Sequence, residues 1–306
     1  ADTLDAVNFP DSRKLEWCPS GHGDVYASLL GTGLLDSLLE EGIRFAFISN
    51  SDNLGATLDF KILNIFKQTG ASFLMEVTQR TEADKKGGHL AKNKDTGALI
   101  LREVAQCEKG DAEAFQNIHK YRYFNTNNIW IRLDSLREQM MESGGVLELP
   151  VIRNRKTVDP TNSNTDPVLQ LEVAMGAAIQ CFENSIALKV PRSRFAPVKT
   201  SEDLFALQSD AYTMTEDFKI QLMPERKEIP PIISLEGDYY NRADQLSLAT
   251  QFGVPSLLHC KQLEVKGPIM FNKGTIFRGS VVVNNSSRQI KDLPAGEYKD
   301  EIIELN

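Results

Sequence analysis

The sequence predicts an α/β protein whose first part carries a mostly parallel, mixed sheet and whose C-terminal part is a separate β-rich unit. Through the first 200 residues, apolar runs of strand length alternate with segments of helical periodicity, which is the rhythm of βαβ units. From about residue 212, short apolar runs follow one another and are separated by Gly267, Gly274 and Gly279. Closely spaced strands with little helix indicate an all-β unit, and a β-helix is one such arrangement.

The spacing of apolar residues predicts the individual elements. Between residues 25 and 39 they recur at helical spacing, with a break at Gly31 and Gly33 and a stop at Gly42. The other expected elements are strands at 43–49, 72–79, 98–106, 121–133 and 186–190 and helices at 57–70, 133–143 and 168–184, with a polar loop at 81–98. Asp134 is the expected cap of the helix at 133–143.

The change after residue 205 from alternating helix and strand patterns to closely spaced short apolar runs predicts a domain boundary. Three prolines lie near the end of the segment 205–230, as they would in a linker. We place the boundary between residues 211 and 212, which gives an α/β domain at 1–211 and a β-rich domain at 212–306.

Composition and charge exclude several classes of protein. The net charge of -8 argues against duplex nucleic acid as the main partner, although it leaves phosphorylated small molecules possible. The four cysteines stand far apart with no CxxC pair, a pattern that fits reduced thiols in the cytoplasm better than a disulfide framework or a zinc site. No apolar run approaches the roughly 18 residues of a membrane span, and no signal peptide opens the chain. We therefore expect a cytoplasmic protein that binds neither nucleic acid nor membrane.

Five polar motifs lie where loops join strands to helices, and each has two interpretations. The segment 20–24 (SGHGD) is either an anion site at a helix start or a flexible loop with an aspartate cap. In 50–56 (NSDNLGA), Asp52 could hold a metal or a ribose hydroxyl, or it could belong to an ordinary Asx turn. The segment 85–91 (KKGGHLA) combines lysines, glycines and a histidine, as many solvated turns also do.

The last two motifs are more unusual. Three asparagines lie within 124–130 (FNTNNIW), although Asn is depleted in strands unless it binds something polar, such as sugar hydroxyls. The segment 191–205 places Arg192, Arg194 and Lys199 ahead of a helix that Thr200 and Asp203 would cap. Those basic residues are either a solvated face or a phosphate clamp.

Together the five motifs predict phosphoryl or nucleotidyl transfer. Loops at the carboxyl ends of parallel strands converge on one rim of a sheet, where ligands bind. A rim of Gly, Asp, Asn, His and Lys, without a Ser-His-Asp or Cys-His arrangement, fits chemistry that depends on positioning and charge neutralisation.

The same motifs carry a resemblance to a known family. The stretches WCPSGHGD, FISNSDNLGA, RTEADKKGGHLA, FNTNNIWI and VPRSRFAPVKTSEDL strongly resemble eukaryotic UTP–glucose-1-phosphate uridylyltransferases, also called UDP-glucose pyrophosphorylases. The resemblance runs from about residue 15 to residue 285, and FAPVKT with the short tail is closest to kinetoplastid members. It implies a Rossmann-like nucleotide-binding domain followed by a small left-handed β-helix. The implied reaction is reversible, Mg²⁺-assisted in-line transfer that makes UDP-glucose and pyrophosphate from UTP and glucose 1-phosphate.

The resemblance also implies roles for individual residues. Asp52 and Lys199 match the catalytic positions, Asp52 as the metal ligand and Lys199 as the lysine that reaches the phosphates. Gly21 and His22 match nucleotide contacts, and Asn50 with Asp52 lies near ribose, sugar and metal. The implied contacts to the sugar and its phosphate are Gly88, Glu103, Phe124, Asn125 and Asn127.

The chain also departs from the family pattern. Members carry a glycine-rich loop of the type GGLGTxMG…GPK near their start and a uracil-reading segment after it, and this chain has neither. It therefore resembles the C-terminal two-thirds of such an enzyme, and we expect this piece alone to be inactive. Two alternatives stay open: a pyrophosphorylase for UDP-N-acetylhexosamine or several UDP-sugars, or a non-catalytic interaction module. The expected assembly is a monomer or a homo-oligomer through the C-terminal domain.

Overall fold

The computed structural model describes residues 5–80, 84–85, 87–104, 107–108 and 110–305. The chain forms two compact units, which are Ala1–Asn50 with Leu58–Val190, and Ser51–Thr57 with Pro191–Asn306. The predicted boundary between residues 211 and 212 lies inside the second unit, so the segment 191–211 groups with the C-terminal strands.

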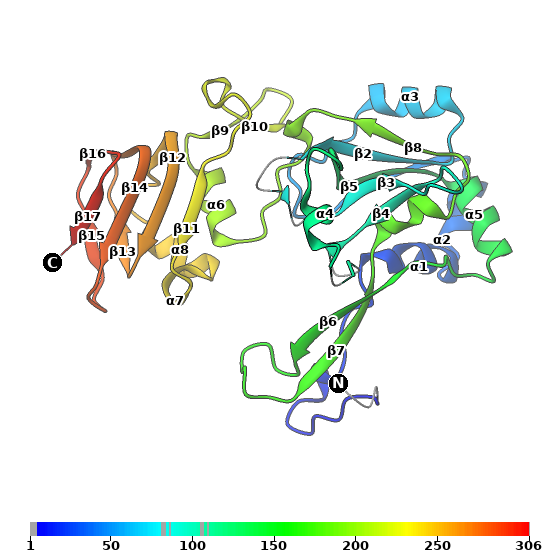
Figure 1. Ribbon diagram of the computed structural model, residues 1–306, viewed down its shortest axis with the longest axis horizontal. Helices are drawn as coiled ribbons and strands as arrows, with labels where there is room; N and C mark the ends of the chain where they lie inside the picture. Colours follow the sequence, from blue (N-terminus) through cyan, green and yellow to red (C-terminus); the bar gives the residue numbers. More distant parts are fainter. Residues whose placement is uncertain (1–4, 81–83, 86, 105–106, 109, 306) are drawn as a thin grey trace. The chain divides into compact units, whose positions relative to one another are not determined.

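The first unit is a mixed sheet with helices on both faces (Figure 1). Its helices are α1 (Val25–Gly31), α2 (Leu34–Glu40), α3 (Phe60–Thr69), α4 (Ala112–Gln116) and α5 (Leu133–Glu142), with 3-10 helices at Arg13–Glu16, His22–Asp24 (η2) and Met175–Gln180 (η5). Its strands are β1 (Phe45–Ile48), β2 (Phe73–Gln79), β3 (His89–Lys92), β4 (Leu99–Arg102), β5 (Tyr123–Arg132), β6 (Val151–Thr157), β7 (Pro167–Val173) and β8 (Ser185–Lys189).

Alternation along the strands separates two apolar layers. Phe73 and Met75 on β2 pack with the residues of α1, α2, α5 and η5 on one face of the sheet. Leu74, which lies between them in the sequence, packs with Ile62 and Phe66 of α3 on the other face. Successive strand residues point to opposite faces, so the continuous apolar run of β2 is buried on both sides, as Figure 1 shows for the helices that flank it.

Local sequence features mark the ends of α1, α2 and α3. Gly33 and Gly42 adopt left-handed φ angles of 75° and 84°, and they separate α1 from α2 and end α2. The side chain of Asp59 accepts from the N–H groups of Lys61 and Ile62 and so caps α3. Gly70, with φ of 66°, ends that helix.

The sheet is mixed, as predicted, but parallel pairing does not predominate among its described strands. β2 pairs with β8 in parallel, whereas β5 runs antiparallel to β1, β2 and β3, and β3 runs antiparallel to β4. The polar loop predicted at 81–98 contains β3, which joins β4 through a tight turn closed by Asn93. Short connections of this kind join antiparallel strands, because parallel strands require a long crossover.

Two further expectations for this unit are wrong. The helix predicted at 168–184 is strand β7 followed by η5, because β7 pairs with β6 along its length and this pairing overrides a helical spacing of apolar residues. Asp134 does not cap α5, since Arg132 holds the N-cap position. The Asp134 carboxylate instead pairs with the Arg132 guanidinium and accepts from the N–H of Ser135. The strand predicted at 98–106 is β4, and residues 105–106 lie outside the described residues.

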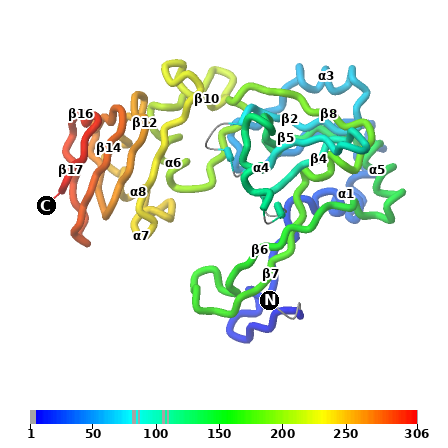
Figure 2. Tube along the Cα trace, viewed as in Figure 1, coloured from blue at the N-terminus to red at the C-terminus, as the bar shows by residue number. Residues whose placement is uncertain are grey.

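The β6–β7 hairpin projects away from the sheet, and the N-terminal segment runs beside it (Figure 2). A backbone hydrogen bond from Val173 N–H to the Ser20 carbonyl (2.9 Å) joins the two where the hairpin returns to the body of the unit. The backbone at Ser20, the first residue of the SGHGD motif, is therefore held against β7.

The second unit is dominated by parallel strands. Its helices are α6 (Ser201–Gln208), α7 (Gly237–Tyr240) and α8 (Ala243–Ala249), with 3-10 helices at Arg192–Arg194 and Pro224–Arg226. Its strands are β9 (Tyr212–Met214), β10 (Ile220–Leu222), β11 (Ile232–Leu235), β12 (Ser256–Lys266), β13 (Ile269–Phe271), β14 (Thr275–Asn285), β15 (Lys291–Leu293), β16 (Gly296–Lys299) and β17 (Ile302–Leu305). Strands β11, β12, β14 and β16 form one parallel sheet, to which β17 adds beside β14, and β13 pairs in parallel with β15.

The core of this unit lies between the parallel sheets and the short helices. Leu257, Leu263, Phe271 and Phe277 are fully buried there, and Phe205 of α6 packs onto Phe271 at a ring distance of 5.4 Å. The predicted capping pair of α6 is present, because Thr200 accepts from the N–H of Asp203 and the Asp203 carboxylate accepts from the N–H of Thr200.

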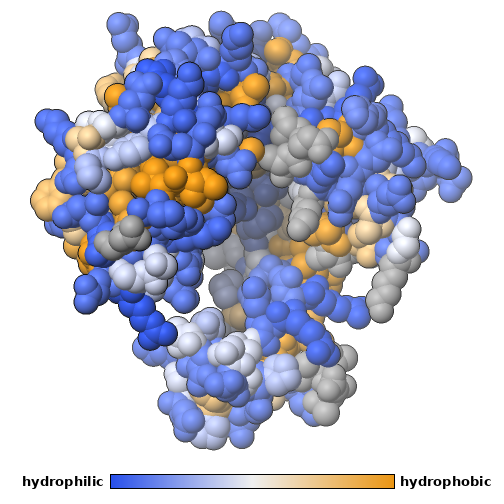
Figure 3. Space-filling model, turned by 60° about the vertical axis from the view of Figure 1, so that its left-hand side comes forward, coloured by the Kyte–Doolittle hydropathy of each residue, from blue (hydrophilic) through white to orange (hydrophobic). Residues whose placement is uncertain are grey.

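Hydrophilic residues cover most of the face drawn in Figure 3, with hydrophobic side chains gathered in separate patches. Phe60, Phe218 and Trp17 are among the large apolar side chains that remain exposed. Across the described residues, no helix combines the length and the hydropathy that a bilayer crossing requires.

Candidate functional site

The motif SGHGD is held against the end of β7. A side chain at Gly21, where φ is 88°, would place its Cβ 2.5 Å from the carbonyl oxygen of Val173, so only glycine fits this approach. His22 is exposed, and its Nδ1 accepts the N–H of Met175 at 2.9 Å. Because Nδ1 is the acceptor, the ring proton of neutral His22 is on Nε2, which is therefore a donor suited to an anion.

Two asparagines of β5 lie beside η5. Asn125 donates from Nδ2 to Asn127 Oδ1, and its Oδ1 accepts the N–H of Asn127 at 2.8 Å. Asn127 has a φ of 57°, in the left-handed region, and the pairing of β2 with β5 shifts register next to it. A Cβ at Gly176 would lie 2.6 Å from Asn125 Nδ2. This bulge is the kind of distortion that redirects side chains beside active sites.

Gly88 and Glu103 complete this cluster. The carbonyl of Gly88 accepts the N–H of Asn125 at 3.1 Å. A Cβ at Gly88 would collide with the carboxylate of Glu103. The structure therefore brings together Gly88, Glu103, Asn125 and Asn127 of the predicted sugar-binding residues, with donors, acceptors and one carboxylate that fit a polyhydroxylated ligand.

For Phe124 and Asn50, the structure gives the burial and the position of each residue. Phe124 is 3% exposed, and as the neighbour of Asn125 on β5 its side chain points to the opposite face. Asn50 is half-buried just beyond the end of β1. Contact of either residue with substrate stays a prediction.

His89, the histidine of the KKGG motif, is a buried structural residue. It is fully buried, its ring stacks on Tyr121 at 4.2 Å, and the guanidinium groups of Arg80 and Arg102 face its two ring nitrogens. Burial and the two guanidinium groups lower the pKa of His89 to about 3. Arg80, which the sequence analysis missed, also donates to the carbonyls of Asp84 and Lys85 and so holds the loop before Gly88.

Asp52 and Lys199 lie together in the second unit. The Asp52 Oδ2 is 4.0 Å from the Lys199 Nζ, with the side chains 33% and 62% exposed. The Oδ1 atom of Asp52 is buried and has no hydrogen-bond partner in the described part of the chain. A buried carboxylate oxygen without a partner is costly unless a ligand satisfies it.

A hard cation fits this arrangement. The described residues contain no group of three or more His, Cys, Asp or Glu side chains that could hold a metal by themselves. Mg²⁺ does not need such a cage, because it is commonly bound by one or two carboxylates together with waters and substrate phosphates. Asp52, with its unsatisfied oxygen, can supply the protein ligand of such a site.

Arg194 is a buried residue that binds backbone, so it does not belong to a solvated face. It is 8% exposed, and its guanidinium donates to the carbonyl of Thr57 at 2.9 Å. Asn53, which the sequence analysis placed in the motif but gave no role, is 4% exposed and bonded to the same segment. One sequence feature could have pointed to Asn53: it lies between Asp52 and Gly55, and Gly55 packs directly against the backbone of Arg194.

Comparisons with known proteins relate the chain to one enzyme family. A family model described as UTP–glucose-1-phosphate uridylyltransferase matches residues 1–278. A relative from Dictyostelium discoideum named UTP–glucose-1-phosphate uridylyltransferase 2 is 37% identical over 294 residues, which are 95% of this chain and 56% of the relative. The barley (Hordeum vulgare) protein of that family name is 39% identical over 302 residues, 98% of this chain and 62% of its own length. The chain thus spans little more than half the length of these relatives.

Solved structures from kinetoplastids are similar along the chain. A UDP-glucose phosphorylase from Trypanosoma brucei has 48% identity and a TM-score of 0.91, over 100% of this chain and 65% of its own. A variant of the UDP-glucose pyrophosphorylase from Leishmania major, in complex with UDP-glucose, has 46% identity and a TM-score of 0.89, over 99% of this chain and 66% of its own. The predicted resemblance to kinetoplastid proteins is therefore confirmed.

Proposed function

Because the chain belongs to the UTP–glucose-1-phosphate uridylyltransferase family, we propose that it is part of an enzyme that makes UDP-glucose and pyrophosphate from UTP and glucose 1-phosphate. A phosphate oxygen of glucose 1-phosphate attacks the α-phosphorus of UTP in line, and the bond to pyrophosphate breaks. One phosphoanhydride replaces another, so the reaction is reversible and needs no covalent enzyme intermediate.

The observation that carries the proposal is the Asp52–Lys199 pair. The Lys199 ammonium, 62% exposed, is available to the phosphate oxygens on which charge accumulates in the transition state. The buried Asp52 Oδ1, which has no hydrogen-bond partner among the described residues, is the ligand through which the chain would hold Mg²⁺. When bound, the metal neutralises phosphate charge and orients the reacting groups.

Residues of the first unit supply recognition. His22 presents a ring N–H to the nucleotide phosphates, and its Nδ1 bond to Met175 sets the ring orientation. Asn125 and Asn127 hold one another in place and would bind the sugar phosphate. Glu103 beside Gly88 would accept from sugar hydroxyls. Gly21, Asn50 and Phe124 complete the proposed substrate contacts.

We also propose a C-terminal fold, a cellular location and a mode of self-association for the protein. The parallel pairing of β12, β14 and β16 supports successive coils of a left-handed β-helix in the C-terminal region. The chain's acidic balance and its free cysteines support a cytoplasmic location. Self-association, if the protein is an oligomer, would use the C-terminal domain.

A turnover assay on the full-length protein tests the proposal. Pyrophosphate release from UTP is measured with glucose 1-phosphate, N-acetylglucosamine 1-phosphate and galactose 1-phosphate. We expect glucose 1-phosphate to give the highest kcat/KM. Preference for the N-acetylated sugar would assign the protein to a different pyrophosphorylase, and no release with any sugar would favour an interaction module.

The variant Asp52→Asn tests the role of the carboxylate in the same assay. The amide keeps the shape and one acceptor oxygen but loses the charge that a hard cation prefers. We expect the Mg²⁺ activation curve to move to higher concentration by about tenfold, equivalent to about 1.4 kcal/mol, with a smaller change in KM for glucose 1-phosphate. An unchanged activation curve would reduce Asp52 to a turn residue.

A further inference from the structure

The side chain of Asn53 joins two segments of the second unit that are far apart in the sequence. Its Oδ1 accepts the N–H of Gly55 at 3.1 Å and the N–H of Ala196 at 2.9 Å, and its Nδ2 donates to the carbonyl of Arg194 at 3.1 Å. The residue is 4% exposed. One buried amide therefore satisfies backbone groups on both the loop 51–57 and the segment 194–196.

Backbone contacts continue this connection toward the two charged residues. The N–H of Leu54 donates to the carbonyl of Ala196 at 3.1 Å, and Asn53 forms an isolated antiparallel bridge with Pro197. The N–H of Val198 donates to the carbonyl of Asp52 at 2.9 Å. Asp52 is thus bonded through its own backbone to the residue that precedes Lys199.

Two neighbouring features prevent the segments from sliding past one another. A Cβ at Gly55 would lie 2.5 Å from the carbonyl oxygen of Ser193 and 2.6 Å from the carbonyl carbon of Arg194, so the backbones touch. The Arg194 guanidinium closes the far end of the loop through the carbonyl of Thr57. The loop 51–57 accordingly belongs to the second unit, although the strand that precedes it belongs to the first.

We propose that Asn53 is a positioning residue that sets the spacing of Asp52 and Lys199 for the uridylyl transfer proposed above, on which this inference rests. Lysine is a long, flexible side chain, and an ion pair at 4.0 Å between partly exposed groups does little to hold it. The backbone at residues 52 and 198 must therefore be held by other groups. Asn53 is a buried side chain that bonds both segments next to Asp52.

Asn285 provides a matched control in the same unit. It is also 4% exposed, its Nδ2 donates to the carbonyls of Pro268 and Gln289 at 2.7 and 2.8 Å, and its Oδ1 accepts the N–H of Ser287 at 3.0 Å. Replacing it removes a similar set of buried backbone bonds without touching the loop 51–57.

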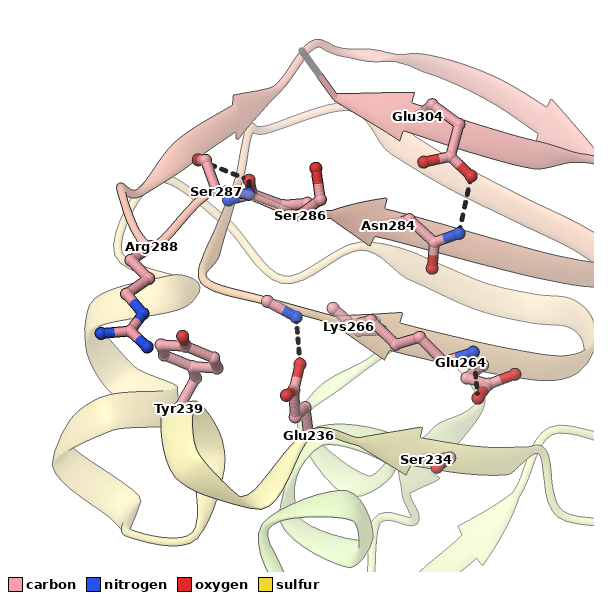
Figure 4. A pocket seen from close by; sticks show the side chains of 13 residues that line it. Ser234, Glu236, Tyr239, Glu264, Lys266, Asn284, Ser286, Ser287, Arg288 and Glu304 are labelled. Carbon is pink, nitrogen blue, oxygen red and sulfur yellow. Dashed lines mark hydrogen bonds and ion pairs between the residues drawn. The ribbon is translucent and has the colours of Figure 1, made fainter.

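Asn285 lines a surface pocket of about 690 Å³, drawn in Figure 4, in which several other polar groups are hydrogen-bonded or ion-paired. Lys266 pairs with Glu264 at 3.0 Å, and Asn284 donates to Glu304 at 2.7 Å.

The test is a double-mutant cycle in the full-length protein, with N53A, K199A, N53A/K199A and N285A. Misplacement of catalytic groups by about 1 Å can cost on the order of 100-fold in rate, so we expect N53A to lower kcat by at least about tenfold with a smaller change in KM. In the K199A background, N53A should add less than about threefold, because one of the two groups whose spacing it sets is already gone. N285A should lower the melting temperature about as much as N53A and leave kcat within about twofold of wild type.

Amide hydrogen exchange gives a readout that does not depend on turnover. N53A should speed exchange at Leu54, Ala196 and Val198, whereas N285A should not. If N53A does not fold, N53D serves instead, because it keeps the acceptor for Gly55 and Ala196 and loses the donation to Arg194; an intermediate kcat is then expected.

Several results would overturn the inference. They are a wild-type kcat in N53A, a kcat loss of equal size in N285A, a full additional loss in the K199A background, or unchanged exchange at Leu54, Ala196 and Val198. A wild-type protein without turnover would instead overturn the proposed function, and the exchange measurement would still decide whether Asn53 joins the two segments.

Discussion

In the first unit, Asn125 and Asn127 bond one another and lie against Gly176, and Gly88 lies against Glu103. In the second unit, one buried carboxylate oxygen of Asp52 has no partner in the part of the chain that the structure describes, and Lys199 lies 4.0 Å from the other oxygen of that carboxylate. One cluster is already satisfied by its own hydrogen bonds, whereas the other is charged and incompletely satisfied.

The difference between the two clusters fits two functions, recognition of the sugar and stabilisation of phosphate charge. Groups that are held by mutual hydrogen bonds present a fixed surface, which suits recognition of a sugar by shape and hydroxyl position. A charged pair with an unsatisfied oxygen gains from a ligand that brings both positive charge and phosphate oxygens. We therefore expect changes in the first unit to affect mainly KM and changes in the second unit to affect mainly kcat.

The largest effect should come from Lys199→Ala in the full-length protein. Loss of a charge-assisted contact to the transition state costs about 2–4 kcal/mol, comparable with removal of an oxyanion-hole donor. We expect kcat for pyrophosphate release to fall by about 100- to 1,000-fold, while circular dichroism and the melting temperature stay close to those of wild type.

Lys261, an exposed lysine on β12 of the same unit, is the control. Lys261→Ala removes the same charge from the surface without touching the loop 51–57, so its kcat should equal that of wild type. A Lys199→Ala protein within threefold of wild-type turnover would remove Lys199 from the mechanism and break the comparison between the units.

A moderate effect is expected from Gly88→Ala. The new Cβ would collide with the carboxylate of Glu103, which must turn away from the position where it would accept a sugar hydroxyl. Loss of that contact should raise the KM for glucose 1-phosphate about tenfold, which corresponds to about 1.4 kcal/mol, and should lower kcat much less.

Gly31→Ala serves as the control because a Cβ there meets nothing within 4 Å. Steady-state kinetics on both variants separate the two parameters. A drop in kcat without a change in KM for Gly88→Ala would show that the first unit contributes to the chemical step. The assignment of binding to the first unit and chemistry to the second would then be wrong.

Several of these features followed from the sequence. Local signals were sufficient for the helix break at Gly33 and the stop at Gly42, because each glycine acts through its own backbone. The family resemblance of the motifs pointed to Asp52 and Lys199, and the structure places these two side chains 4.0 Å apart.

Long-range contacts were beyond reach. The pairing that makes 167–173 a strand depends on β6, and nothing within 168–184 records that partner. Asn53 had no predicted role and Arg194 was assigned to either a solvated face or a phosphate clamp, because the contacts of both residues join segments about 140 residues apart.

The smallest effect on turnover at neutral pH should come from a substitution of His89. This histidine lies in a buried cluster with Arg80 and Arg102 that stabilises the fold and is not assigned to substrate binding. The pKa of His89 is about 3, below the ordinary value of 6.5, so the folded protein keeps the ring neutral. The unfolded chain takes up a proton below about pH 6.5 and the folded chain does not, so the stability contributed by neutral His89 is present above that pH and is lost as pH falls toward 3.

We therefore expect His89→Gln to have near-wild-type turnover at pH 7.5 and a weaker loss of stability in acid. Between pH 6 and 4, the free energy of unfolding of wild type should fall more steeply than that of the variant, by up to about 1.4 kcal/mol per pH unit for one proton. Urea unfolding at several pH values measures this difference. His119→Gln, at an exposed histidine of the same unit, is the control and should keep the wild-type slope. Parallel pH profiles for wild type and His89→Gln would mean that His89 is protonated in the folded protein, and that the two guanidinium groups do not face a neutral ring.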